Sequence, residues 1–194
     1  MKNNVTTTTK ILQILNLITI ILAVWAGYYV NSGANGMTDM KTMSDRYENL
    51  LTPAGYAFSI WGLIYLGLVI FGIYQASGLF SKKGNSDVAA KTGIWFIVAN
   101  LCNAAWVFAF SYEQIGLTVL IMIVIFIALL RIVQIHNLER WDAEFKTIAF
   151  LWWPISLYFG WINVALIANI ACYLTSLGWT GAPFNPEVLA SGVL

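Results

Sequence analysis

Long uncharged runs of mostly apolar residues, separated by short polar segments, dominate this sequence. The charged residues bound five such runs, at 11–38, 49–81, 92–112, 114–130 and 147–186. A helix crosses the hydrocarbon core of a bilayer with about 17–25 residues, so each run is long enough for one crossing. The pattern therefore predicts five membrane helices, with approximate cores at 11–30, 56–79, 92–112, 115–136 and 149–176.

The two terminal runs need separate interpretation. The last run is long enough for a further crossing, but it has no turn signal between Pro154 and Gly178. We therefore expect one long helix with Pro154 near its start, where a missing amide donor costs least. The first run ends in the polar segment 31–36 rather than at a small-residue cleavage site, so we interpret it as a retained anchor and not a signal peptide.

Composition agrees with a membrane location. Of the 194 residues, 59% are hydrophobic and only 10% are charged, whereas soluble domains carry about 25% charged residues. The formal net charge is only +1, so the sequence lacks the excess of basic residues that is typical of nucleic-acid-binding proteins. We therefore expect an all-α integral membrane protein, a five-helix bundle that forms a single transmembrane domain over residues 1–194, with no nucleic-acid partner.

The positions of lysine and arginine predict the orientation, because positive residues resist translocation. Only Lys41 and Arg46 lie in the loop 31–55, on the side opposite to the N-terminus. We therefore predict that the N-terminus is cytoplasmic and the C-terminus outside, in a bacterial cell (inner) membrane. The positive residues on the predicted inner side are Lys2, Lys10, Lys82, Lys83, Lys91, Arg131, Arg140 and Lys146.

The predicted outer loop, residues 31–55, has an amphipathic pattern. Its apolar residues recur at near-helical spacing among charged ones, which indicates a short helix. This helix would form a lid over the outer mouth of the bundle or rest on the lipid headgroups. The apolar positions are Met40, Met43, Tyr47, Leu50 and Leu51.

Uncharged polar residues within the runs are candidates for bonds between helices. We expect Asn100, Asn163 and Asn169 to act mainly as such structural clamps. His136 has no second histidine or cysteine at ligand spacing, so we interpret it as a solvated interfacial residue and predict no metal site. No nucleophile–base pair is evident, so we assign no catalytic residue and expect a protein that is not an enzyme.

Aromatic residues form stripes at helical spacing on three of the predicted helices. Phe58, Trp61 and Tyr65 follow one another on the second helix, and Tyr158 and Trp161 lie on the fifth. On the third, Asn103, Trp106 and Phe110 share a face. Core packing would explain one such stripe, but three stripes beneath a long loop predict a pocket for a flat, apolar ligand.

The order of these residues resembles the TspO/MBR family, the tryptophan-rich sensory or translocator proteins. The segment 52–55, Thr-Pro-Ala-Gly, followed by Phe58, Trp61 and Tyr65, is similar to the family's proline turn and Trp-x-x-x-Tyr helix. The segment 103–106, Asn-Ala-Ala-Trp, resembles its third-helix motif. The resemblance also includes Pro154 and the aromatic cluster after it, Tyr47 and Leu50 of the loop, and Phe108 and Phe110.

The resemblance covers roughly residues 46–175, with departures that indicate a divergent branch. The family's usual Pro-Pro is Pro53-Ala54 here, Arg46 replaces a loop tryptophan, and Tyr158 occupies the place of a fifth-helix tryptophan. No Lys or Arg follows Lys146, so the family's sterol-recognition motif is not supported.

The resemblance implies a TspO-like bundle, commonly a homodimer, that binds porphyrins or other tetrapyrroles beneath the first loop. We therefore expect a receptor or sensor for a planar hydrophobic ligand, porphyrin or haem-like, with no required cofactor. The alternatives are a small transporter of such ligands, a porphyrin-degrading enzyme and a structural membrane subunit. The candidate ligand-binding residues are Tyr47, Pro53, Phe58, Trp61, Tyr65, Asn103, Trp106, Phe110, Tyr158 and Trp161.

Overall fold

The computed structural model describes residues 6–33, 36–80, 86–138, 140 and 142–179. Every regular element within these ranges is helical, which confirms the all-α fold class. The elements are α1 (Thr7–Asn31), α2 (Met40–Arg46), the 3₁₀ helix η2 (Gly55–Ser59), α3 (Ile60–Phe80), α4 (Ser86–Thr92), α5 (Trp95–Ser111), α6 (Ile115–His136), α7 (Phe145–Thr147), the π-helical turn η3 (Ile148–Trp152) and α8 (Trp153–Ser176).

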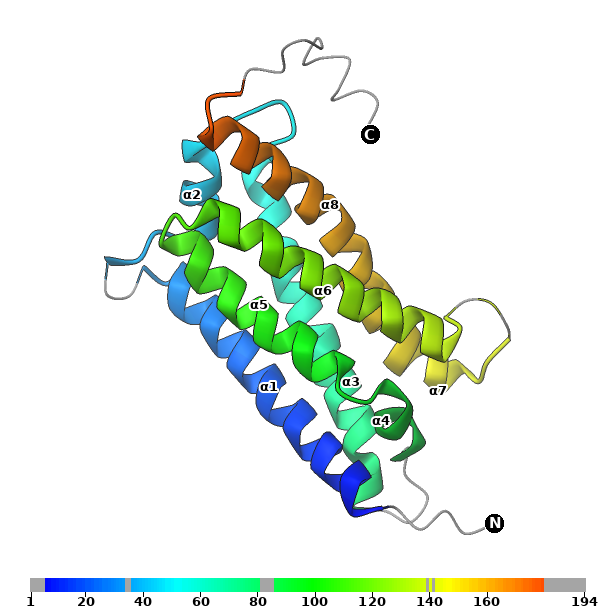
Figure 1. Ribbon diagram of the computed structural model, residues 1–194. Coiled ribbons are helices and arrows are strands. Elements are labelled where there is room, and N and C mark those ends of the chain that lie inside the picture. Colours follow the sequence, from blue (N-terminus) through cyan, green and yellow to red (C-terminus); the bar gives the residue numbers. More distant parts are fainter. Residues whose placement is uncertain (1–5, 34–35, 81–85, 139, 141, 180–194) are drawn as a thin grey trace.

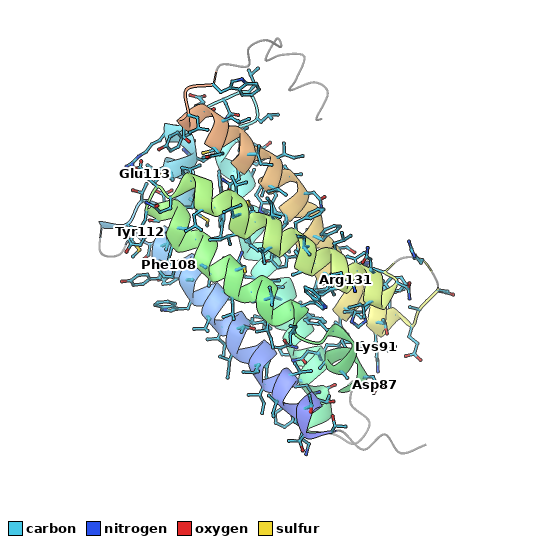
Figure 2. All side chains as sticks on the ribbon, in the orientation of Figure 1. Asp87, Lys91, Phe108, Tyr112, Glu113 and Arg131 are labelled. Carbon is cyan, nitrogen blue, oxygen red and sulfur yellow. The ribbon has the colours of Figure 1, made fainter. Side chains whose placement is uncertain are left out.

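The long helices form a closed ring around one core (Figure 1). Helix α1 packs against α3 and α5, and α8 packs against α3 and α6. Contacts between α5 and α6 complete the ring, so its order is α1, α3, α8, α6, α5. Figure 2 labels Asp87 and Lys91 at one end of this bundle and Glu113 at the other.

Apolar side chains cover the outside of the ring as well as its core. Ile21, Ile73 and Leu120 expose more than 60% of their surface, a pattern that suits contact with lipid rather than water. Among the residues that the structure describes, four helical stretches are long and apolar enough to cross a membrane. They are Thr7–Asn31, Gly55–Phe80, Ile115–His136 and Phe145–Ser176, and α5 is a shorter apolar helix of 17 residues.

Helix α4 corrects the predicted boundary of the third apolar segment. The sequence predicts a helix from residue 92, but α5 begins at Trp95, and the separate helix α4 ends at Thr92. Gly93 lies between them with φ of +59°, a left-handed conformation that glycine adopts without steric cost and that ends a helix. In the hydrophobic pattern of the sequence, the charged residues Asp87 and Lys91 make the segment of α4 look like a polar loop between two apolar helices.

The last helical stretch begins earlier than predicted and includes a wide turn. It runs from Phe145 through η3 to α8, in which Pro154 is the second residue. Proline has no amide hydrogen to donate to the preceding turn, which gives a reason for a local π-helical turn just before it. Pro154 packs against α3 at Gly67, where an added Cβ would lie 3.4 Å from the proline Cα.

Candidate functional site

A small cavity lies at the end of the bundle that α2 covers. Its free volume is about 40 Å³. The lid helix, the segment after it and three long helices all contribute to its wall. The lining residues are Ser44, Pro53, Phe58, Trp61, Trp106, Phe110, Trp161, Ala165, Ala168, Asn169 and Cys172.

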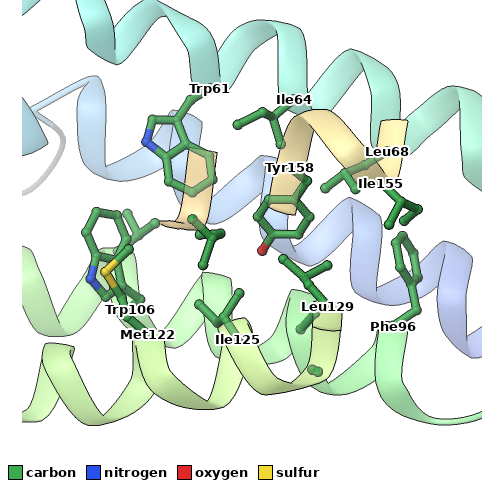
Figure 3. Packing of buried hydrophobic residues seen from close by; sticks show 14 of the residues in the cluster. Trp61, Ile64, Leu68, Phe96, Trp106, Met122, Ile125, Leu129, Ile155 and Tyr158 are labelled. Carbon is green, nitrogen blue, oxygen red and sulfur yellow. The ribbon is translucent and has the colours of Figure 1, made fainter. Parts of the chain in front are cut away.

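Aromatic rings from α3, α5 and α8 form most of this wall. The rings of Trp61 and Trp106 are 5.9 Å apart and nearly parallel, with an interplanar angle of 28°. Phe110 extends this stack at 5.2 Å from Trp106, and Trp161 meets Trp61 edge-on at 6.4 Å. Figure 3 shows Trp61 and Trp106 at one end of the buried core. The wall is therefore built mostly from aromatic rings, a composition that suits a planar apolar ligand.

One amide fixes the orientation of Trp106. The indole Nε1–H of Trp106 donates to Asn169 Oδ1 at 2.8 Å. Asn169 Nδ2 in turn donates to the hydroxyl of Thr118 at 2.9 Å. These bonds join α5, α8 and α6 and confirm the expected clamp at Asn169. At Asn163 the expectation is wrong, because its amide donates to Phe159 O of its own helix at 2.6 Å.

A layer of polar atoms lies beside Trp61, outside the cavity lining. Trp61 contacts the rings of Tyr65 at 5.7 Å and Tyr158 at 6.3 Å, and the Tyr65 hydroxyl donates to Asn103 Oδ1 at 3.4 Å. Gly27 of α1 leaves room for the Tyr65 ring, since an added Cβ would collide with it. The Tyr158 hydroxyl lies beside the same Asn103 side chain. At the cavity itself, Trp161 Nε1 is a buried donor without a hydrogen-bond partner in the part of the chain that the structure describes.

Helix α2 packs on the bundle as a lid. Met40 and Met43 are almost completely buried, so the apolar face of α2 contacts protein and not the lipid headgroups. Leu50 is 63% exposed and does not share this buried face, contrary to the predicted spacing. Tyr47 is half-buried at the end of α2 and does not line the cavity.

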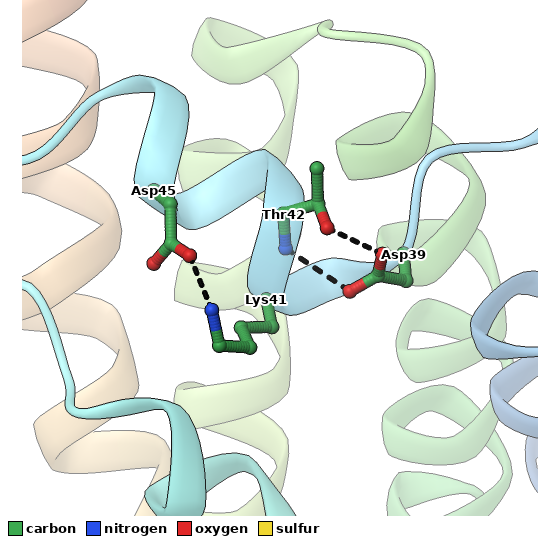
Figure 4. Close-up of polar contacts among 4 residues, drawn as sticks. All are labelled: Asp39, Lys41, Thr42 and Asp45. Atoms are coloured by element: carbon green, nitrogen blue, oxygen red, sulfur yellow. Dashed lines mark hydrogen bonds and ion pairs between the residues drawn. The ribbon is translucent and has the colours of Figure 1, made fainter.

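Polar contacts fix the start of the lid helix (Figure 4). Asp39 caps α2 by accepting from Thr42 N at 3.0 Å and from the Thr42 hydroxyl at 2.6 Å. Partial burial opposes ionisation of Asp39, but these hydrogen bonds outweigh it and lower the pKa of its carboxyl. The carboxyl of Asp39 therefore carries its charge at neutral pH. Within the same helix, Lys41 pairs with Asp45 at 2.5 Å.

An ion pair connects the lid to the turn between α5 and α6. Arg46 Nη1 lies 2.6 Å from Glu113 Oε1, and both side chains are about half exposed. Glu113 has a φ of +57°, a left-handed conformation that few residues other than glycine adopt. The pair crosses from the lid to this turn and holds α2 over the cavity.

Replacing Glu113 by glutamine is expected to speed release of a bound ligand about twofold to fourfold, because exposed ion pairs contribute about 0.2–1 kcal/mol. The effect should shrink at high salt, which screens such pairs. Stopped-flow dissociation of a planar aromatic probe measures the rate. Asp45→Asn is the control, because it removes the Lys41 pair without touching the turn. Equal rates for native protein and Glu113→Gln would show that the pair does not hold the lid.

A second, lateral cleft of about 300 Å³ adjoins the cavity. The segment 50–57 forms one side of the cleft, and α8 forms the other. Pro53, Trp161 and Ala168 line both spaces. Trp161 therefore lies at the boundary between the two spaces.

The structure brings together six of the ten candidate ligand-binding residues at the cavity: Pro53, Phe58, Trp61, Trp106, Phe110 and Trp161. Tyr65, Asn103 and Tyr158 lie in the adjoining polar layer, and Tyr47 lies at the end of the lid. Sequence reasoning missed Ser44, Ala165, Ala168, Asn169 and Cys172 as lining residues. Ala165, Ala168 and Cys172 follow Trp161 at helical spacing, which is the signal that could have identified them.

His136 is not the solvated residue that the sequence suggests. It is half-buried at the end of α6, where its Nε2 lies 2.8 Å from the hydroxyl of Thr92. Within the described ranges, no group of three or more His, Cys, Asp or Glu residues is arranged to hold a metal ion.

Comparison of the sequence with known protein families gave one match. Residues 13–194 match the family described as TSPO-like protein, which covers nearly the whole chain. A search of curated proteins gave no match, and a search of solved structures gave none either.

Proposed function

We propose, from the premise that the chain belongs to the TSPO-like protein family, that it is a membrane receptor for a planar hydrophobic ligand. Membership and the long apolar helices identify a membrane protein and point to a sensor or transporter type of function. The proposed ligand is a porphyrin or another tetrapyrrole, bound beneath α2. The observation that carries this proposal is the stack of Trp61, Trp106 and Phe110 at the cavity wall.

The buried polar atoms beside this stack favour a ligand with polar groups at its edge. Buried donors and acceptors are costly when unpaired, yet Trp161 Nε1 has no partner within the described chain, and Tyr158 Oη has only the Asn103 side chain beside it. Carboxylates or ring nitrogens of a tetrapyrrole would satisfy them. In this proposal the rings bind by stacking, and the polar atoms fix the orientation of the ligand.

The size of the cavity requires the site to open before binding. Ligand pockets usually measure about 300–1,000 Å³, whereas this cavity has about 40 Å³. Two movements would enlarge it: displacement of the lid α2, and rotation of Trp161 toward the lateral cleft. We propose that binding couples to both, so that α2 reports whether the site is occupied.

Packing below the site favours a receptor over a transporter. Ile64, Leu68 and Ile155 are completely buried and fill the bundle beneath Trp61 (Figure 3). A ligand as large as a tetrapyrrole would have to displace this core to cross the bundle, and close-packed interiors resist such displacement. Transport is therefore an alternative in this proposal and not its first choice. Porphyrin degradation is the other alternative.

The membrane arrangement is part of the same proposal. We propose that α5 also crosses the bilayer, since its 17 residues reach the lower limit of about 17 for a span. The start of α1 and the helices α4 and α7 lie toward the bundle end opposite the lid (Figure 1). These segments carry Lys10, Lys91 and Lys146, which supports a cytoplasmic N-terminus in a bacterial inner membrane. A homodimer in the bilayer completes the arrangement.

Titration of the purified protein with protoporphyrin IX tests the proposed function. We expect saturable quenching of tryptophan fluorescence by protoporphyrin, haem and bilins, and little quenching by cholesterol, which cannot stack. Quenching that rises linearly without saturation would contradict a binding site. Flux of protoporphyrin into proteoliposomes would instead support a transporter. New pigment products formed in light or in the dark would support a porphyrin-degrading enzyme.

A further inference from the structure

A polar cleft lies at the opposite end of the bundle from the aromatic cavity. Helix α4, the end of α6, the start of the last helical stretch and α3 enclose it, and its volume is about 370 Å³. It is therefore much larger than the free space of the aromatic cavity. Figure 2 labels Asp87 and Lys91 of its wall at this end, far from Glu113.

The wall of this polar cleft carries both signs of charge. Lys91 supplies a positive group, and Asp87 and Asp142 supply negative groups. Of the ion pairs that the described part of the chain forms, none includes Lys91 or Asp142. Asp142 Oδ1 only accepts from its neighbour's amide, Ala143 N, at 3.0 Å. Lys91 and Asp142 thus face one space without pairing with each other, which suits a ligand that carries both signs of charge.

The hydrogen bonds of His136 define a further acceptor in this wall. The Thr92 hydroxyl donates its one hydrogen to Val88 O at 2.8 Å. His136 Nε2 lies 2.8 Å from the same hydroxyl, and we assign the tautomer in which Nε2 donates, because the hydroxyl has no second hydrogen to give. In the neutral imidazole, this leaves Nδ1 as the acceptor. The ring lines the cleft, so an N–H donor of a ligand has a partner there.

Apolar residues complete the wall. Leu151 and Trp152 line the cleft and are almost completely buried. The cleft also lies where the apolar helices end and charged residues begin, at the depth that lipid headgroups occupy in a bilayer. A ligand at this level would place an apolar part against Leu151 and Trp152 and a charged part near Lys91 and Asp142.

We propose that this cleft binds a phosphoethanolamine group. Lys91 would pair with the phosphate, while Asp142 and His136 would accept hydrogen bonds from the primary ammonium. A choline group has no N–H to donate, so the acceptors distinguish ethanolamine from choline. The group has two sources, a bilayer phosphatidylethanolamine or the soluble glycerophosphoethanolamine. This inference is independent of the tetrapyrrole site.

Native mass spectrometry of the purified protein with added lipids tests this inference. We expect phosphatidylethanolamine to bind about fivefold more tightly than phosphatidylcholine or phosphatidylglycerol, as charge-assisted hydrogen bonds allow. Glycerophosphoethanolamine is then added as a competitor. Displacement of the lipid would identify the headgroup alone as sufficient, and no displacement would identify the bilayer lipid as the source. Equal binding of the three lipids would overturn the proposal.

Variants with matched controls separate this site from general charge effects. Lys91→Gln and Asp142→Asn should each weaken phosphatidylethanolamine binding about threefold to tenfold, and Asp142→Asn should also reduce the preference over phosphatidylcholine. Lys146→Gln and Glu144→Gln make the same charge changes at exposed positions outside the cleft and should bind normally. Equal losses in the controls would overturn the proposal. Trp61→Leu should leave this binding unchanged, which separates it from a failure at the tetrapyrrole site.

Discussion

Replacing Asn169 by leucine is expected to destabilise the bundle by about 1–3 kcal/mol, the cost of leaving a buried polar group unpaired. The change removes two bonds between helices, from Trp106 Nε1 and to the Thr118 hydroxyl. Each such bond contributes about 0.6–1.7 kcal/mol in membrane proteins. The indole of Trp106 would lose its fixed orientation as well, so the cavity wall should also become less ordered.

Reversible unfolding in mixed micelles measures this loss of stability. Asn163→Leu is the matched control, because it makes the same substitution on the same helix. The Asn163 amide bonds only within α8, to Phe159 O, so we expect a change below about 0.5 kcal/mol there. Equal destabilisation at both positions would mean that the bonds of Asn169 do not clamp the three helices.

Replacing Trp61 by leucine is expected to weaken binding of protoporphyrin about threefold to twelvefold. Leucine keeps apolar bulk but removes the ring face, and aromatic pairing is worth about 0.5–1.5 kcal/mol beyond area burial. Trp61 is the ring that meets Trp106, Trp161, Tyr65 and Tyr158. Its loss should therefore affect every stacking surface of the proposed site.

Fluorescence titration of folded protein, checked by circular dichroism, measures this affinity. Trp153→Leu is the control, since Trp153 is 56% exposed on the outside of α8 and does not line the cavity. Its variant should bind normally. If Trp153→Leu lost as much affinity as Trp61→Leu, the aromatic stripes would reflect packing and lipid contact rather than a ligand site.

The sequence by itself determined the helical class and the approximate location of the apolar helices. Long uncharged runs can satisfy their backbone groups in lipid only by forming helices, so their positions follow from composition alone. The stripe of Phe58, Trp61 and Tyr65 was also evident, because residues three and four apart share a face of any helix. The same rule located Trp106 and Phe110.

Only the tertiary structure decided which faces meet and which side chains border empty space. Periodicity identifies a face of Asn163 or Asn169, but the crossing of α5, α6 and α8 determines that Asn169 alone reaches a neighbouring helix. The helical spacing of Ala165 and Ala168 after Trp161 indicates their face of α8, but only packing decides that their short side chains border the cavity. The segment of α4 resembled a loop because the charged residues Asp87 and Lys91 interrupt the apolar pattern there. Cavities and clefts arise from side chains that fail to fill the space between helices, and no local sequence pattern records that space.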